Sequence, residues 1–451
     1  MSKLIVSVSG VRGIIGDSLT PEVVFHFGAA FGSLNKGGRI VLGRDSRVSG
    51  PMLSSAVVAG LISTGCEVVD IGITSTPTVQ IMTKELNADG GIEITASHNP
   101  VMWNGLKFMS ADGLFVSERT GEKIKQAALN KEYSFMSWDK LGSISRDSSA
   151  VKTHIQKVLS LPYLDVDAVR KRRFKVVVDT VNGAGGGIIP ELLKRLGCEV
   201  TVLNEEMNGH FAHEPEPLPK NLKQLSDEIV KRGVDIGFAV DPDVDRCAIV
   251  DEKGTPIGEE YTLVIAAKLV LSKKKGKVTV NVSTSMAIDD VAREYGCPVE
   301  RTRVGEINVA LKMKDNKSVV GGEGNGGVMI PDIHIGRDAP VACALVLQYL
   351  LESGETLSEI KETLPKYVIF KGKVDLEDKE PKLILEGLKK LMAKEKVDET
   401  DGLKIIRDKS WVHIRGSNTE PIVRIYAEAE NLKKAKRLHD EFREKVLRVT
   451  R

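Results

Sequence analysis

The sequence predicts an α/β protein: three similar α/β domains built on mixed sheets around a central cleft, followed by a smaller C-terminal α+β domain. Three observations support this fold class. The chain has 451 residues, which is too long for one ordinary domain and suits roughly three or four. One strand–helix–strand pattern occurs three times before residue 366, and after that point the pattern changes.

The repeated pattern is a β-branched strand, a helical stretch that ends at glycine, and a second strand entered through Gly-Cys-x-Val. Its first strands are 39–45, 174–179 and 277–282, and its second strands begin at Gly65, Gly197 and Gly296. A short connection of this kind gives a right-handed crossover between parallel strands. We therefore expect each copy to form one α/β domain.

Each copy then reaches a third strand that ends in an unusual loop, at 91–100, 235–246 and 318–327. Ligands of open α/β sheets bind outside the carboxyl ends of the strands, so we expect the three loops to face one shared cleft. The predicted domains are 1–150, 151–253, 254–366 and 367–451. The last is expected to contain a charged helix over 382–396, strands at 411–414 and 423–427, and a closing helix from Asn431.

Composition excludes several classes of protein. Hydrophobic residues make up 41% and charged residues 28%, and the net charge of +2 argues against nucleic-acid and membrane partners. The N-terminus lacks an apolar signal core, and the sequence has no run of about 18 uncharged apolar residues. Five scattered cysteines without CxxC spacing suit a reducing compartment. We expect a cytoplasmic protein.

The second loop carries three aspartates at alternating positions, Asp241, Asp243 and Asp245. In an extended loop this spacing turns all three carboxylates to one side, where an all-oxygen site suits Mg²⁺. A calcium-binding EF-hand is rejected, because its obligatory sixth-position glycine is Arg246 here. The remaining alternative is an acidic surface turn.

The other loops admit two interpretations each. Ser97, on a tight loop after a strand, is a candidate nucleophile, or a turn residue that caps its own backbone. Glu323 and Asn325 lie in a glycine-rich loop that suits sugar hydroxyls, although such loops are also ordinary turns. In the C-terminal part, a phosphate-binding group or a hydrophilic turn is formed by Arg415, Ser417, Asn418 and Thr419.

These four loops, in this order, resemble those of the α-D-phosphohexomutase superfamily, which includes phosphoglucomutase, phosphomannomutase and phosphoglucosamine mutase. The resemblance covers the whole chain. It implies a phosphoserine at Ser97, which is also a metal ligand together with the three aspartates. The sequence 9–13 is similar to the superfamily's N-terminal phosphate-contacting segment, which includes Arg12, and Lys107 is similar to its active-site lysine.

The resemblance also implies a two-step transfer. Phosphorylated Ser97 gives its phosphoryl group to a hexose phosphate, which yields a 1,6-bisphosphate. This intermediate reorients in the site, and its other phosphate is transferred to Ser97. One Mg²⁺ per site, Arg12, Lys107 and Arg246 would stabilise the transferring group. Glu323 and Asn325 would bind sugar hydroxyls, and the Arg415 loop the non-reacting phosphate. A hexose 1,6-bisphosphate is the expected activator.

One departure concerns the acid/base. Many bacterial relatives have a histidine where this chain has Gly327, so Lys107 or His98 is expected to carry the proton. The glycine-rich loop is similar to that of phosphoglucosamine mutases, whereas Asn418 and 213–219 are closer to phosphomannomutase/phosphoglucomutase. Glucosamine phosphate is the favoured substrate. A metal-dependent sugar phosphatase or a sugar-phosphate binding protein is the alternative of another class, and the chain is expected to be a monomer or a homodimer.

Overall fold

The computed structural model describes the whole chain except residues 1–3, 8–9, 377–379, 417–421 and 450–451. The chain forms two compact units. Unit 1 contains Met1–Leu269 and Asn325–Lys361, and unit 2 contains Val270–Gly324 and Glu362–Arg451. Each unit is described by itself below.

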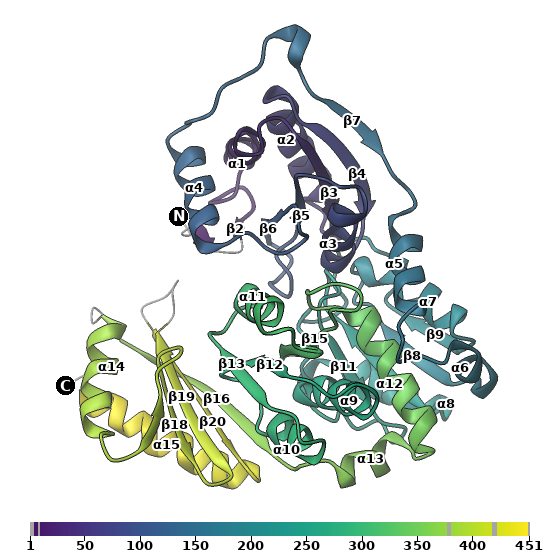
Figure 1. Ribbon diagram of the computed structural model, residues 1–451, viewed down its shortest axis with the longest axis vertical. Helices are drawn as coiled ribbons and strands as arrows, with labels where there is room; N and C mark the ends of the chain where they lie inside the picture. Colours follow the sequence, from purple (N-terminus) through teal and green to yellow (C-terminus); the bar gives the residue numbers. More distant parts are fainter. Residues whose placement is uncertain (1–3, 8–9, 377–379, 417–421, 450–451) are drawn as a thin grey trace. The chain divides into compact units, whose positions relative to one another are not determined.

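The first sheet of unit 1 has seven strands in the order β1-β2-β6-β5-β3-β4-β7 (Figure 1). Their bounds are β1 (Ile5–Ser7), β2 (Gly10–Ile14), β3 (Arg39–Arg44), β4 (Glu67–Ile73), β5 (Gly90–Ile94), β6 (Trp103–Ser110) and β7 (Ser143–Arg146). The helices are α1 (Pro21–Leu34), α2 (Gly50–Ser63), α3 (Thr76–Glu85) and α4 (Glu118–Leu129). Strand β3 pairs in parallel with β4 and β5, whereas β6 is antiparallel to β5, so the sheet is mixed as predicted.

The chain order places helices on both faces of this sheet. It moves from β3 to β4 through α2 and then back past β3 to β5 through α3, and right-handed crossovers in opposite directions lie on opposite faces. Alternate residues of β5 and β6, Ile92, Ile94, Leu106 and Phe108, belong to the core formed with α1 and α2. The residues between them, Glu93 and Lys107, therefore face α3.

The second sheet of unit 1 repeats the central part of the first, with the order β11-β10-β8-β9. Its strands are β8 (Lys175–Asp179), β9 (Glu199–Leu203), β10 (Ile236–Val240) and β11 (Cys247–Val250). The helices around it are α5 (Ala150–Leu159), α6 (Val166–Arg172), α7 (Ile189–Arg195) and α8 (Lys223–Arg232). Strands β10 and β11 are antiparallel, and the aspartate loop connects them.

The third copy of the pattern lies in unit 2. Strand β12 (Val278–Asn281) pairs in parallel with β13 (Val299–Thr302) and β14 (Val320–Glu323). Helices α10 (Ala287–Glu294) and α11 (Glu306–Asn316) connect these strands. In all three copies the first strand is central, so the predicted repeat is confirmed. The other elements within residues 254–366 are α9 (Glu259–Lys273), β15 (Gly327–Met329), α12 (Ala339–Ser353) and α13 (Leu357–Thr363), of which β15 and α12 belong to unit 1.

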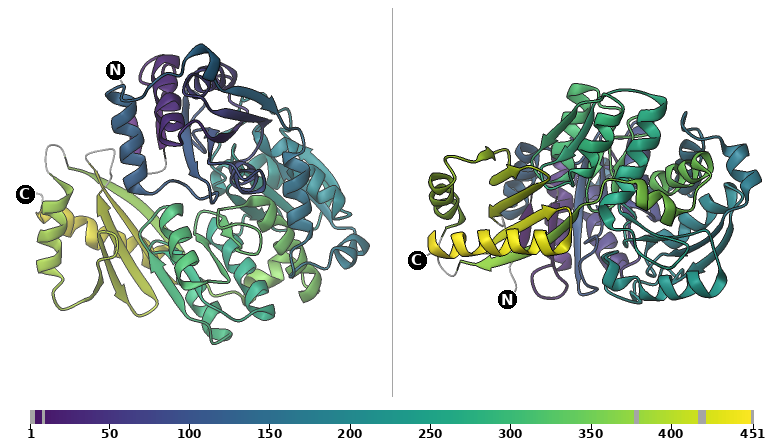
Figure 2. Two further views of the ribbon diagram at one scale, coloured as in Figure 1. Left: turned by 45° about the horizontal axis from the view of Figure 1, so that its top comes forward. Right: turned by 90° about the horizontal axis from the view of Figure 1, so that it is seen from below.

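The C-terminal part of unit 2 is an antiparallel sheet in the order β16-β20-β19-β18-β17. Its strands are β16 (Val368–Asp375), β17 (Lys396–Asp398), β18 (Leu403–Arg407), β19 (Ser410–Gly416) and β20 (Ile422–Ala429). Helices α14 (Pro381–Leu391) and α15 (Leu432–Val449) pack their apolar residues on this sheet, and Figure 2 shows α15 along one face. The predicted α+β class is confirmed.

One expectation for this sheet was wrong in detail, and three strands were missed. The helix predicted over 382–396 ends at Leu391, because Lys396 already pairs with Ile406 of β18. Strands β16, β17 and β18 were not predicted. Pairing with neighbouring strands overrides the helical preference of a Lys/Glu-rich segment.

Two further observations bear on the expectations from composition. All five cysteines are buried and free. Among the described residues, no helix is both long and apolar enough to span a membrane.

Candidate active site

Ser97 lies three residues beyond the end of β5, in a tight loop with an unusual backbone. Its φ is +51°, a left-handed conformation that is uncommon for residues other than glycine and that is often found at functional sites. Its N–H donates to Thr95 Oγ1 at 2.8 Å, which stabilises this turn. The residue is 2% exposed, so its hydroxyl is held inside the protein.

Arg47 holds the Ser97 loop in shape. This fully buried guanidinium donates to four backbone carbonyls at 2.6–2.9 Å, those of Ser97, Asn99, Pro100 and Trp103. Asp45 pairs with Arg47 Nε at 3.0 Å and also accepts from Thr95 Oγ1 at 2.6 Å. Burial raises the pKa of Asp45, although the Arg47 charge opposes this. Arg47 was missed in the sequence, where its place just after the first strand was the available indication.

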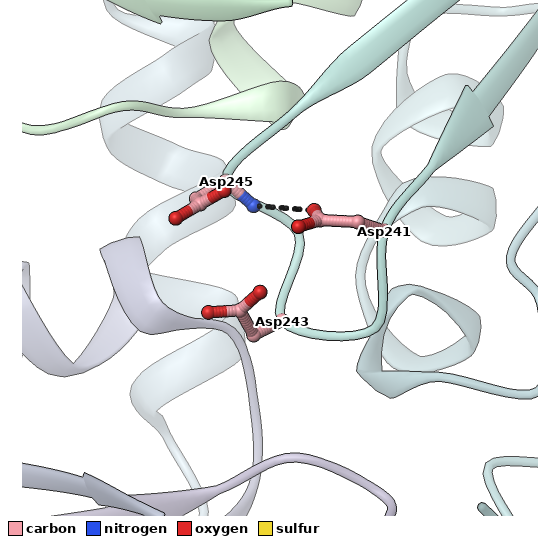
Figure 3. Close-up of side chains that lie close together, drawn as sticks. All are labelled: Asp241, Asp243 and Asp245. Atoms are coloured by element: carbon pink, nitrogen blue, oxygen red, sulfur yellow. Dashed lines mark hydrogen bonds between the residues drawn. The ribbon is translucent and has the colours of Figure 1, made fainter. Parts of the chain in front are cut away.

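The three aspartates converge between β10 and β11, as Figure 3 shows. All are fully buried, and one carboxylate oxygen from each lies within 4.8 Å of the others. We predicted an extended loop, but the structure shows a turn. Val244 has a φ of +62° and donates its N–H to the Asp241 carbonyl at 3.0 Å. Asp241 Oδ1 accepts the N–H groups of Asp245 and Arg246, each at 3.1 Å.

This group of carboxylates fits a hard divalent cation. Within the described part of the chain, Asp243 Oδ1 and Asp245 Oδ1 are buried and accept no hydrogen bond, which is costly unless a ligand satisfies them. Burial and then the charges of Asp245 and Asp243 raise the pKa of Asp241 well above its usual range. Ser97 Oγ donates to Asp241 Oδ2 at 3.1 Å, so the serine hydroxyl lies beside the same group.

Two cationic side chains pair with the outer oxygens of this group. Lys107 Nζ lies 2.5 Å from Asp243 Oδ2 and 3.4 Å from Asp245 Oδ2, and it donates to Thr76 Oγ1 at 3.2 Å. Burial lowers the pKa of Lys107, but the two aspartates outweigh it and the net shift is upward. Arg337 Nη2 lies 2.6 Å from Asp245 Oδ2.

The other predicted basic residues of unit 1 lie around Ser97. Arg246 Nη1 pairs with Glu216 Oε1 at 2.9 Å, and its Nε lies 3.8 Å from Asp245 Oδ1. His98 Nδ1 is 3.3 Å from Ser97 Oγ, and burial together with Arg246 and Arg12 lowers the pKa of its imidazole well below the usual value.

Arg12 contacts the Ser97 loop through its Nη1, which donates to Asn99 Oδ1 at 3.1 Å. Burial lowers the pKa of the Arg12 guanidinium, although Asp243 opposes this. Ser97 thus lies between a carboxylate and an imidazole, and guanidinium groups approach the same loop. This arrangement can hold an anionic group on the serine oxygen.

Glu323 and Asn325, the predicted sugar-binding residues, are held by local contacts. In unit 2, Glu323 Oε1 accepts from Asn281 Nδ2 at 2.8 Å and from the Gly305 N–H at 2.9 Å, and the side chain is 4% exposed. In unit 1, Asn325 is half-buried and its Oδ1 accepts the Gly327 N–H at 3.3 Å.

Arg415 lies near the end of β19 and is half-buried. Its Nε is buried and makes no hydrogen bond with any described residue. Its predicted partners Ser417, Asn418 and Thr419 lie outside the described residues.

Besides Arg47, three further residues of the site in unit 1 were not predicted from the sequence: Thr76, Glu216 and Arg337. Arg337 precedes Asp338, whose side chain caps the start of α12. The available indication in the sequence was the charged pair Arg337-Asp338, which lies between a glycine-rich loop and an apolar helix. For Thr76 and Glu216 we find no local pattern, because long-range folding brings them to the site.

The family described as "Phosphoglucomutase/phosphomannomutase" matches in four successive parts: alpha/beta/alpha domains I, II and III over residues 3–134, 152–254 and 258–367, and the C-terminal domain over 373–445. Three α/β domains, a small C-terminal domain and the aspartate group define a member of the α-D-phosphohexomutase superfamily. Within it, the chain belongs to the phosphoglucomutase/phosphomannomutase family, which confirms the resemblance.

Individual relatives agree with this assignment. A Thermococcus kodakarensis protein named "Phosphoglucomutase/phosphomannomutase" is 41% identical over 436 residues, 95% of each chain. A Methanopyrus kandleri protein named "Probable phosphoglucosamine mutase" is 38% identical, over 96% of each chain. The crystal structure of a phosphoglucomutase/phosphomannomutase family protein from Burkholderia thailandensis has a TM-score of 0.86 at 27% identity, covering 99% of this chain and 98% of that one.

Proposed function

We propose that this chain is a phosphohexomutase that interconverts hexose 6-phosphate and hexose 1-phosphate through a phosphoserine at Ser97. One observation carries the proposal: the buried Ser97 hydroxyl donates to Asp241, within a group of three carboxylates that fits a divalent cation. A non-enzymatic sugar-phosphate binding protein needs neither feature. Membership of a mutase family also argues against a sugar phosphatase.

The proposed reaction has two phosphoryl transfer steps. The bond between phosphorus and Ser97 Oγ breaks, a bond to the free hydroxyl oxygen of the hexose phosphate forms, and the hydroxyl proton passes to a base. The bisphosphate then reorients in the site. Ser97 Oγ accepts the other phosphoryl group, and the proton returns to the departing sugar oxygen. A hexose 1,6-bisphosphate would phosphorylate an unloaded enzyme, which makes it the expected activator.

Electrostatics would support these steps. Mg²⁺, one ion per site, would be held by the three aspartates and an oxygen of phosphorylated Ser97, and when bound it supplies charge neutralisation to the transferring group. Arg12 and Arg246 add positive charge around the same oxygen. His98 is the candidate proton carrier by position, since its Nδ1 lies 3.3 Å from Ser97 Oγ, and Lys107 is the alternative.

The rest of the substrate would be bound by the other predicted residues. Glu323 and Asn325 suit hydroxyls that both orientations of the sugar share. Arg415, whose Nε has no described partner, suits the non-reacting phosphate together with Ser417, Asn418 and Thr419. We further propose a cytoplasmic monomer or homodimer.

Glucosamine phosphate is the sugar we favour. Full-length relatives at 34–38% identity carry phosphoglucosamine mutase names. The second candidate is a phosphoglucomutase/phosphomannomutase, favoured by the name of the relative that is 41% identical.

Two measurements test the proposal. Mass spectrometry of the protein after incubation with glucose 1,6-bisphosphate should place one phosphate on Ser97 and none on Ser55, an exposed serine of α2. Turnover of glucosamine, glucose and mannose phosphates, measured side by side with the bisphosphate present, identifies the sugar. Absence of phosphate on Ser97 would exclude the phosphoserine pathway, and net release of inorganic phosphate without isomerisation would indicate a phosphatase.

A further inference from the structure

Glu93 is a buried carboxyl group that the proposed mechanism does not use. It is 0% exposed, and neither of its carboxyl oxygens has a hydrogen-bond partner among the described residues. Burial, and then the charges of Asp45 and Asp243, raise the pKa of Glu93 well above its usual value. Burial is less unfavourable for the neutral acid than for the carboxylate. Even so, no hydrogen bond to a described residue offsets the cost of burying its two oxygens.

The carboxyl of Glu93 lies between the first sheet and the start of α3. The residues on either side of it in β5, Ile92 and Ile94, belong to the core on the opposite face. A Cβ placed on Gly43 of β3 would lie 2.6 Å from Glu93 Oε2 and 2.5 Å from Val79 of α3. The carboxyl therefore extends over β3 toward α3.

Lys107 shares this layer with Glu93. The two residues are directly opposite each other in the antiparallel pairing of β5 and β6, so both side chains lie on the α3 face. Side chains at opposed positions have Cβ atoms about 4.5–5.5 Å apart. The Lys107 ammonium also contacts Thr76, the first residue of α3, so a small rearrangement of its flexible side chain would bring it to Glu93.

The position of Lys107 conflicts with cation binding. Its ammonium lies 2.5 Å from Asp243 Oδ2 and 3.4 Å from Asp245 Oδ2, where a divalent cation on the aspartates would repel it strongly in a buried site. A buried ammonium that loses its carboxylates needs another anionic partner. Asp45 is already engaged with Arg47 and Thr95, whereas both oxygens of Glu93 are available.

We propose that Glu93 is a positioning residue for Lys107, and that it becomes the ion-pair partner of the lysine ammonium when a divalent cation binds the three aspartates. The inference rests on the proposed cation site. Lys107 would alternate between two sets of carboxylates, and an ammonium beside Glu93 would stabilise the carboxylate form of that side chain. Glu93 would thereby favour cation binding without being a ligand.

Calorimetric titration of full-length protein with MgCl₂ tests this, using the wild type, Glu93→Gln, Lys107→Met and the double variant. Without its second partner Lys107 should stay on the aspartates, so Glu93→Gln should raise the Kd for Mg²⁺ by about 5–20-fold, as expected for coupled neighbours. Lys107→Met should bind Mg²⁺ at least as tightly as the wild type. In that background Glu93→Gln should change the Kd by less than about twofold.

The controls separate this inference from simpler effects. An unchanged Kd in Glu93→Gln, or equal weakening with and without Lys107, overturns the proposal; the second result would mean that Glu93 acts only as a distant charge. If neither the wild type nor Lys107→Met binds Mg²⁺, the proposed cation site itself fails. A crystal structure of the wild type with Mg²⁺ tests the same point without any variant. We expect the Lys107 ammonium within hydrogen-bond distance of Glu93. A Lys107 ammonium that still contacts Asp243 would contradict the proposal.

Discussion

Two sheet faces of this protein bury charged side chains, and they differ in how the carboxylates are arranged. On the α3 face of the first sheet, Lys107 meets Asp243 and Asp245, and each of these two aspartates keeps one buried oxygen without a hydrogen bond in the described chain. One oxygen from each of Asp241, Asp243 and Asp245 lies within 4.8 Å of the others. Such a group can accept a cation, which suits a site where a ligand binds.

The C-terminal sheet of unit 2 is the contrasting case. Lys404, His413 and Glu428 point away from the core that α14 and α15 cover, and they contact the third α/β repeat. Lys404 donates to the Val282 carbonyl at 2.6 Å and lies 4.3 Å from the Trp411 ring centre. These contacts join the C-terminal sheet to the third α/β repeat within unit 2. The cluster holds one carboxylate, whereas three carboxylates converge in unit 1. Burial of charge alone does not indicate a functional site; several carboxylate oxygens that converge on one point do.

The largest expected effect is that of Ser97→Ala. Removing the proposed nucleophile should lower mutase turnover by roughly 10⁴-fold or more while the melting temperature stays within a few degrees of the wild type. Steady-state kinetics with saturating bisphosphate measures this, with Ser55→Ala as the matched control. Near-normal turnover in Ser97→Ala would mean that the buried charged group of unit 1 is not the catalytic site.

Asp243→Asn should have the next largest effect. It removes one of three converging charges, so Mg²⁺ affinity should fall and turnover should drop by about 10²-fold. Turnover across a Mg²⁺ series gives both quantities, and Asp227→Asn on the exposed face of α8 is the control. If the Mg²⁺ dependence is unchanged, the three aspartates have a structural role, as the charged cluster of unit 2 does.

Arg415→Ala should weaken substrate binding by roughly one to two orders of magnitude, since charge-assisted hydrogen bonds to a phosphate are lost. We expect KM to rise and more bisphosphate to escape, whereas Lys433→Ala on exposed α15 should change neither. Trapping of released bisphosphate during turnover tests the second effect. An unchanged KM without extra release would make Arg415 a structural residue like its neighbours in the cluster.

The smallest effect concerns Lys404 and pH. Burial, then the charge of Arg301, lowers the pKa of Lys404 to about 7, from 10.5. The unfolded chain then binds more protons than the folded one between these values, so this residue should make stability rise with pH from about 7 to 10.5. Lys404→Met should remove that contribution. Relative to the wild type, its melting temperature should therefore be higher by about 2–4 °C at pH 7, and the difference should shrink by pH 9.

Scanning calorimetry at both pH values, with turnover measured at pH 7, checks this prediction. A constant difference between the two proteins would mean that Lys404 stays protonated across the range. A loss of turnover at equal stability would place the cluster in catalysis.

Much of the fold followed from periodicity, because each repeat is a local strand–helix–strand unit with its own start and stop residues. The Ser97 loop and the aspartates were also found, since each lies within a few consecutive residues. Arg47, Arg337 and Glu93 could not be assigned. Their roles depend on contacts with loops far away in the chain, and a buried glutamate within a strand has no local pattern.

The Arg47 anchor has a consequence for protein engineering. Its acceptors in the loop are the backbone carbonyls of Ser97, Asn99, Pro100 and Trp103, so these four hydrogen bonds require no particular side chain at the positions between Pro100 and Trp103. Val101 and Met102 are 46% and 52% exposed and belong to that segment. Libraries randomised at these two positions should retain the conformation of Ser97, the proposed nucleophile, so both positions are suitable for changing selectivity while the proposed site stays intact.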